Sequence, residues 1–202
     1  MNVRGLKVYA EPSAEPVTTA EIKAQLAITT AVTTHDARIA NLAKAARQAV
    51  EKRIRRTIIN TTLDLYLDHF PRNPHCEYRK HHKAMELLRP PVSSVTSVTY
   101  INTAGVDTAF THYVTDLVSL VPRIVPAYGY DWPYTQDIIN AVKIRYVAGY
   151  GAAAANVPEP IRQAIIMLVI DLFEHPEANV EISLNENKSM GFLLNPYTVP
   201  IL

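Results

Sequence analysis

The sequence predicts an α+β fold, with a small core of three main helices and an antiparallel β insertion between the second and third helices. Apolar residues recur three and four positions apart over residues 35–55 and again over 158–175, which is typical of helices. Between these stretches the period changes to two. The 202 residues suffice for one domain with an insertion. Extended arms are expected at both ends.

The N-terminal third predicts an arm followed by two helices. Residues 1–17 are punctuated by Pro12 and Pro16 and are expected to be extended. Thr18 and Glu21 match a capping box, in which each side chain satisfies a free backbone N–H of the other residue. They predict a short helix ending near residue 28. The second helix should end in a basic run at 52–56, which suits the negative end of its dipole.

Residues 57–150 are predicted to form the β insertion. Leu63, Leu65 and Leu67 alternate with polar residues, so Asp64 and Asp68 are expected on a solvated face. Gly105 should supply the positive φ of a hairpin turn after a strand at 95–101. Further strands are expected at 110–114, 121–125 and 141–147.

The last quarter of the chain predicts a buried helix and a C-terminal arm. The helix over 158–175 is apolar on most sides, so it should lie in the core or at a subunit interface. Residues 176–202 show no helical period, and we expect an apolar arm that docks elsewhere. The expected anchors of this arm are Met190, Phe192, Leu193, Leu194, Tyr197, Val199, Ile201 and Leu202.

Composition excludes several classes of protein. Twenty Lys and Arg residues against nineteen Asp and Glu give a net charge of +1, so no overall field draws the chain to DNA or anionic lipid. The single cysteine, Cys76, excludes an intramolecular disulfide and a multi-cysteine zinc site. The longest strongly apolar run, 164–170, is too short to span a membrane. We expect no cofactor and no membrane partner.

The residues of a polar loop at 71–86 suggest either a metal site or a contact with DNA, and for each the alternative is a solvated loop without such a role. His69, His75, Cys76, His81 and His82 cluster near it and could hold a metal, but the interleaved cations would repel one. Arg79, Lys80 and Lys83 could instead face DNA, or the loop could simply be solvated. With neither a glycine-flanked nucleophile nor a phosphate loop in the sequence, we expect no enzyme.

The segment 127–134 concentrates large aromatic side chains, which are enriched at protein interfaces. It predicts either a contact surface or a loop that packs back over the sheet. The residues concerned are Tyr128, Tyr130, Trp132 and Tyr134.

Six motifs in order resemble the head–tail connector (adaptor, or head-completion) proteins of tailed phages, prophages and gene transfer agents. They are Glu15-Pro16-Val17-Thr18-Thr19-Ala20-Glu21, I-x-x-L-x-x-A-A-R-x-x-V-E from Ile39, Leu88-Arg89-Pro90-Pro91-Val92-Ser93-Ser94-Val95-Thr96-Ser97-Val98-Thr99-Tyr100, Pro126-Ala127-Tyr128-Gly129-Tyr130-Asp131-Trp132-Pro133, Val147-Ala148-Gly149-Tyr150-Gly151, and Val157-Pro158-Glu159-Pro160-Ile161-Arg162-Gln163-Ala164. The resemblance covers about residues 15–175.

The resemblance implies a structural virion protein. Such proteins form a ring, commonly twelvefold, beneath the portal, where they extend the DNA channel and carry the next neck or tail-completion protein. DNA would pass without sequence-specific binding, and the protein would reside in the virion neck after assembly in the host cytoplasm. A connector domain over 18–175 would then comprise helices in 18–56 and 158–175 and the insertion at 57–150. The family brings no catalytic residues.

The C-terminal arm at 176–202 has no motif match, so its role is inferred from its residues. We expect residues 185–202 to dock on the portal, and the four aromatic residues of 128–134 to contact a neighbouring subunit or neck protein. Two other hypotheses stay open. One is a non-viral scaffold or adaptor that binds a partner through the same arm, and the other is a metal-dependent enzyme centred on the His-rich loop.

Overall fold

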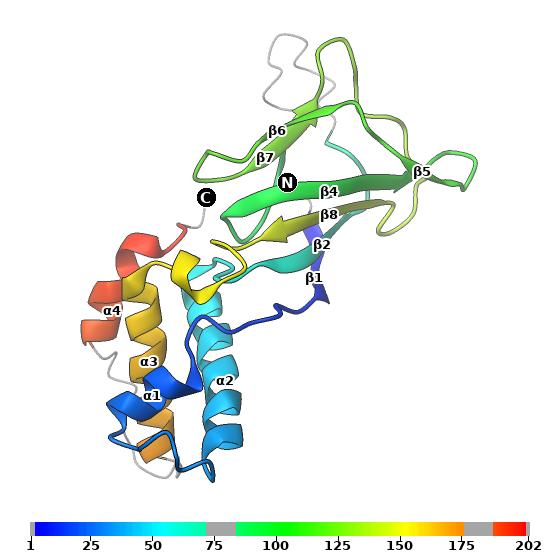
Figure 1. The fold of residues 1–202 in the computed structure, drawn as a ribbon. Helices are drawn as coiled ribbons and strands as arrows, with labels where there is room; N and C mark the ends of the chain where they lie inside the picture. Colours follow the sequence, from blue (N-terminus) through cyan, green and yellow to red (C-terminus); the bar gives the residue numbers. More distant parts are fainter. Residues whose placement is uncertain (1–2, 72–83, 176–187, 201–202) are drawn as a thin grey trace. The chain divides into compact units, whose positions relative to one another are not determined.

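The structure, a computed structural model, describes residues 3–71, 84–175 and 188–200. The chain divides into two compact units. The β unit comprises residues 1–12 and 60–150, and the helical unit comprises residues 13–59 and 151–202. The predicted α+β class, with a β region between the second and third helices, is confirmed (Figure 1).

The β unit contains two antiparallel sheets. The larger one has the strand order β1-β2-β8-β4-β5, and the smaller one has the order β3-β7-β6. The strands are β1 (Val3–Ala10), β2 (Thr61–Leu67), β3 (Met85–Glu86), β4 (Val92–Ile101), β5 (Asp107–Ala109), β6 (Tyr113–Asp116), β7 (Arg123–Pro126) and β8 (Val142–Ala148). Residues 3–10, expected as an extended arm, are extended but form an edge strand that pairs with β2.

The core of the β unit draws its side chains from both sheets. Leu63, Leu65 and Leu67 of β2 point into it, as their alternation predicts, together with Tyr146 of β8 and Ile124 of β7. In the region expected as one returning strand, Phe110 lies buried between two short strands, β5 and β6. The predicted turn is present, since Gly105 has a φ of 79° and Asn102 Oδ1 accepts the N–H groups of Ala104 and Val106.

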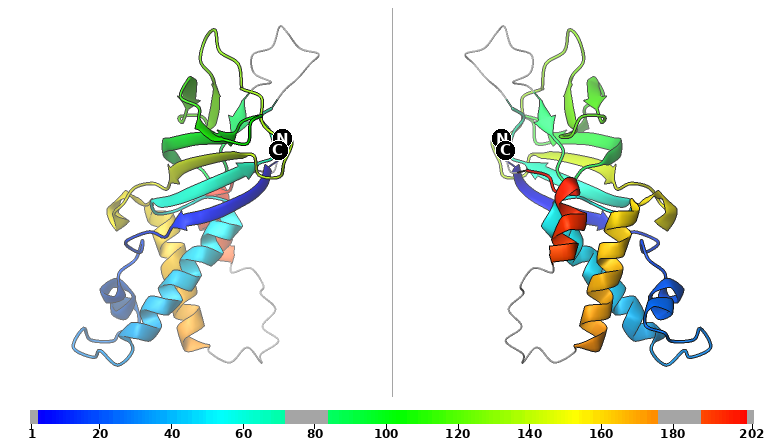
Figure 2. Two further views of the ribbon diagram at one scale, coloured as in Figure 1. Left: turned by 90° about the vertical axis from the view of Figure 1, so that its right-hand side faces the viewer. Right: turned by 90° about the vertical axis from the view of Figure 1, so that its left-hand side faces the viewer.

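The helical unit is built on two long helices, α2 (Asp36–Ile54) and α3 (Glu159–Glu174), which contact each other and run in opposite directions (Figure 2). The short helix α1 (Thr19–Gln25) contacts both, and α4 (Lys188–Leu194) contacts α3. Two 3-10 turns complete the unit, η2 (Ala154–Asn156) and η3 (Asn195–Tyr197). Ile39, Val50 and Ile54 of α2 are buried along the predicted stripe. None of the helices in the described part of the chain has the length and apolar character to cross a membrane.

The structure overturns the predictions for Asp64 and for the helix content of the C-terminal region. Asp64 is not solvated, because it is almost fully buried in an ion pair with Arg145 of the neighbouring strand. The C-terminal region is also not without a helix, since α4 and η3 occupy residues 188–197. Seven residues make only two helical turns, too few to display a period of 3.6.

Candidate interaction surfaces

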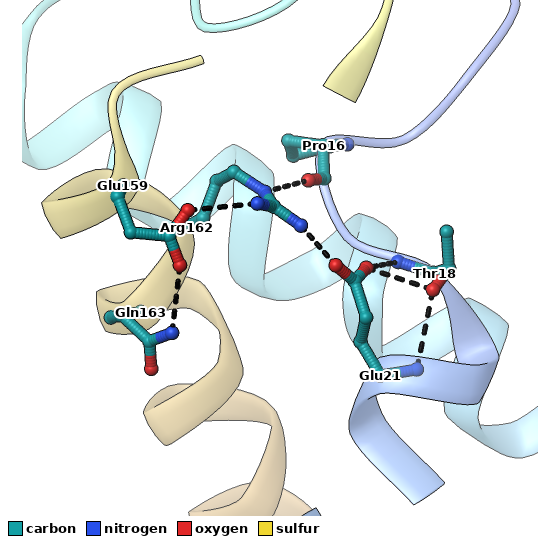
Figure 3. Close-up of polar contacts among 6 residues, drawn as sticks. All are labelled: Pro16, Thr18, Glu21, Glu159, Arg162 and Gln163. Atoms are coloured by element: carbon teal, nitrogen blue, oxygen red, sulfur yellow. Dashed lines mark hydrogen bonds and ion pairs between the residues drawn. The ribbon is translucent and has the colours of Figure 1, made fainter. Parts of the chain in front are cut away.

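Arg47, which is buried, and Arg162, which is half-buried, join three of the sequence motifs within the helical unit. The Arg162 guanidinium of α3 donates to Pro16 O (3.0 Å) and to Glu159 Oε2 (2.8 Å), and it pairs with Glu21 of α1 (Figure 3). Glu21 in turn accepts the Thr18 N–H (2.7 Å), which completes the predicted capping box. The first and the last motif therefore meet around one side chain.

The ionisation of this cluster follows from its hydrogen bonds. Burial disfavours the charged form of Glu21, but hydrogen bonds from Thr18 and Arg162 outweigh it, so the pKa of Glu21 lies below its ordinary value. Burial likewise opposes the charge on Arg162, yet Glu21 and Glu159 raise the pKa of Arg162. Both groups are charged and bonded to each other, so we assign the cluster a structural role.

Arg47 joins the second motif to the first in the same way. It lies on α2, 2% exposed, with Nε 2.7 Å from Glu15 Oε2 and a terminal nitrogen 3.1 Å from Glu51 Oε2. The other Glu51 oxygen accepts the Ile58 N–H at 2.9 Å. In the sequence, the spacing of four residues between Arg47 and Glu51 on a predicted helix was the pattern that could have indicated this ion pair.

The C-terminal segment 188–200 docks on its own helical unit. The Val199 N–H donates to Ile54 O at the end of α2 (3.0 Å), while Arg55 donates to Val199 O (3.3 Å) and Arg56 to Tyr197 O. The basic end of α2 therefore does more than suit the helix dipole, because two of its arginines bind the returning chain.

The expected anchor residues of this segment differ in how exposed their side chains are to solvent. Leu194 is fully buried within the chain, so the prediction that it contacts a partner is wrong for this residue. Phe192 is 82% exposed. Four others are half-buried: Met190, Leu193, Tyr197 and Val199. Ile201 and Leu202 lie outside the described residues.

The aromatic segment 127–134 divides in a similar way. Trp132 is 4% exposed and stacks on Phe70, with ring centroids 4.7 Å apart, so it belongs to the core and its assignment to an interface is wrong. Tyr128 is 89% exposed, and Tyr134 is exposed as well. Tyr130 is half-exposed and stacks on His112 at 4.0 Å. Both interpretations of this segment therefore apply, each to different residues.

The face of the five-stranded sheet opposite the core leucines of β2 carries an ion pair that the sequence did not predict. Arg145 Nε lies 2.7 Å from Asp64 Oδ1, and its guanidinium lies 3.3 Å from the centroid of the Tyr9 ring. The hydrogen bond from Arg145 to Asp64 raises the pKa of the arginine, so the pair stays ionised. This arrangement ties edge strand β1 to β8 across β2.

The polar loop lies largely outside the described residues. Arg79, Lys80, Lys83 and most of the His-rich cluster fall within 72–83, and only His69 of that cluster is described. Among the described residues, there is no group of three or more His, Cys, Asp or Glu side chains that could hold a metal ion.

The whole chain is similar in fold to proteins of gene transfer agent particles. A chain from the neck of an empty particle, computed with C6 symmetry, matches with a TM-score of 0.77 and 23% identity over 98% of both chains. A chain from the virion of a native particle gives 0.77 and 21%, and one from a native neck computed with C12 symmetry gives 0.71 and 23%, each with the same coverage. No protein-family model and no curated protein sequence matches this chain.

Proposed function

We propose that this protein is a structural component of the neck of a phage-like particle, where it forms a ring that joins the portal to the tail. The observation that carries the proposal is the match in fold over 98% of both chains to neck proteins of gene transfer agents. The order of the six sequence motifs points independently to the same class of protein. A structural role also fits the two arginine clusters, whose charged groups are engaged with each other.

The first part of the proposed role is the formation of a ring by copies of this chain. Copies of the chain would contact one another head to tail through two different surfaces, as a closed cyclic assembly requires. Two of the similar structures come from necks computed with C6 and C12 symmetry, and we expect a twelvefold ring. DNA would pass through its channel without sequence-specific binding, with Arg79, Lys80 and Lys83 facing it.

Binding to the portal is assigned to the C-terminal segment. Phe192 presents a large apolar side chain to solvent from a helix that the rest of the segment holds in place. Half-buried Met190 and Leu193 flank it. Exposed Tyr128, Tyr130 and Tyr134 of the β unit are assigned to a contact with a neighbouring subunit or with the downstream neck or tail-completion protein, because exposed tyrosines are efficient interface anchors.

The proposal is tested by mixing the purified chain with the cognate portal ring and measuring the mass of the complex. One copy bound per portal subunit supports the neck role and the virion location that follows from it. A chain that stays monomeric and does not bind the portal contradicts the proposal and favours a scaffold or adaptor outside the virion. A metal analysis of the same preparation addresses the remaining hypothesis, since stoichiometric zinc would support an enzyme.

A further inference from the structure

One corner of the larger sheet exposes a patch that is both apolar and acidic. The segment 135–141 lies along the β4–β5 hairpin, because the Gln136 N–H donates to Ile101 O (3.0 Å) and the Ile101 N–H donates to Ala141 O (2.8 Å). Every residue of the resulting patch is exposed, and Ile139 is 80% exposed. We call it the hairpin corner, formed by Val106, Asp107, Asp137, Ile138 and Ile139.

The opposite edge of the same sheet has the complementary character. Strand β1 is the outermost strand and pairs only with β2 in the sheet. Lys7, Val8 and Tyr9 are exposed along it, and the Tyr9 ring covers the Arg145 guanidinium. We call Lys7, Val8 and Tyr9 the β1 edge. It offers the Lys7 cation and apolar surface, where the hairpin corner offers carboxylates and apolar surface.

The placement of the two patches matches the requirement of a ring. A closed ring of identical copies needs two different surfaces that face opposite neighbours. The β1 edge and the hairpin corner lie at opposite edges of one five-stranded sheet. We propose that the hairpin corner of one copy docks on the β1 edge of the next copy, an inference that rests on the proposed function and names its subunit contact.

The contact is made by side chains and not by addition of a strand. β1 has register shifts between Val3 and Gly5 and between Val8 and Ala10. On the far side, β5 has only three residues. Bulges and short strands of this kind protect sheet edges from pairing with another strand. Apolar contact among Ile139, Val8 and Tyr9, framed by Asp137 and Lys7, gives the usual layout of an apolar centre with a charged rim.

Cross-linking of rings assembled on the cognate portal tests this contact. In a Cys76→Ser background, Lys7→Cys and Asp137→Cys are combined, and the rings are treated with a short bismaleimide. Because both positions are exposed, we expect a ladder of covalent oligomers on a denaturing gel. Each single-cysteine variant should yield no species beyond a dimer. The control pairs Lys7→Cys with Val118→Cys, a fully exposed position at the β6–β7 turn, and should give no ladder.

The outcomes separate this inference from the proposed function. Rings that assemble normally but give no ladder, or give the same ladder with the control pair, refute the contact and leave the neck role intact. Failure of the unmodified chain to assemble on the portal overturns the proposed function, and the subunit contact falls with it. A ladder specific to the Lys7 and Asp137 pair supports both.

Discussion

Replacing Phe192 with serine should weaken binding to the portal without weakening the fold. Its side chain is 82% exposed on α4, so removing the ring takes little from the packing of the helical unit. The neighbouring buried position Leu194 provides the opposite case. It is fully buried, and Leu194→Ala should cost about 2–5 kcal/mol of stability, as cavity-forming substitutions do.

The size of the effect follows from the exposed surface. Complete burial of a phenylalanine side chain contributes about 1.5–3 kcal/mol. With 82% of Phe192 still available, burial against a partner would contribute about 1.2–2.5 kcal/mol per copy. Since about 1.4 kcal/mol is a tenfold change in Kd, Phe192→Ser should weaken each contact roughly seven- to sixtyfold.

Co-sedimentation with the portal over a range of concentrations measures this change, and chemical denaturation of each variant alone measures stability. Tyr128→Ser is the matched control, because it removes an even more exposed aromatic ring from the other unit. Portal binding by Phe192→Ser within twofold of the unmodified chain would refute the assignment of the C-terminal segment. A large loss of stability in that variant would refute the reasoning from exposure.

Three other predictions follow from the described contacts. Trp132→Ala should destabilise the β unit by about 3–5 kcal/mol, whereas Tyr128→Ala should change stability by less than about 0.5 kcal/mol; equal denaturation midpoints would contradict this. The pKa of Glu21 is lowered by folding, so its stabilising contribution is present above its ordinary pKa of 4.5 and is lost as pH falls through the lower folded value. Glu21→Gln should therefore narrow the difference in urea midpoint between pH 7 and pH 3, and an unchanged difference would refute the assignment. Lys7→Glu and Asp137→Lys should each impair ring assembly, and the two reversals combined should restore it, as mass photometry would show; a double variant no better than the singles would count against the pair.

Patterns within one element predicted the fold well. The capping box at Thr18 and Glu21, the buried stripe of α2 and the alternating leucines of β2 are all local, and the structure has each of them. They depend on spacing along a single helix or strand, which the sequence displays directly.

Contacts between distant segments could not be predicted in this way. Asp64 is buried in an ion pair with Arg145 of β8, whose guanidinium lies against the Tyr9 ring of β1, and alternation along β2 cannot reveal contacts with other strands. Trp132 belongs to the core because Phe70 provides a face for it to stack on. Exposure of Ile139 likewise depends on where the β7–β8 loop lies along the β4–β5 hairpin.

The candidate surfaces were predicted as segments but not as residues. Apolar composition identified the C-terminal segment and the aromatic run at 127–134, yet within each segment some side chains pack inward. Leu194 and Trp132 are buried, while Phe192 and Tyr128 are exposed, because the orientation of each side chain is fixed by packing against other parts of the chain. Residue-level assignment therefore required the structure.

The central claim is that the chain forms a ring on a portal, and the mass of the complex with the cognate portal ring tests it most directly. Native mass spectrometry of the mixture should give one copy of this chain per portal subunit. A chain that remains monomeric, with the portal ring at its unbound mass, would contradict the account.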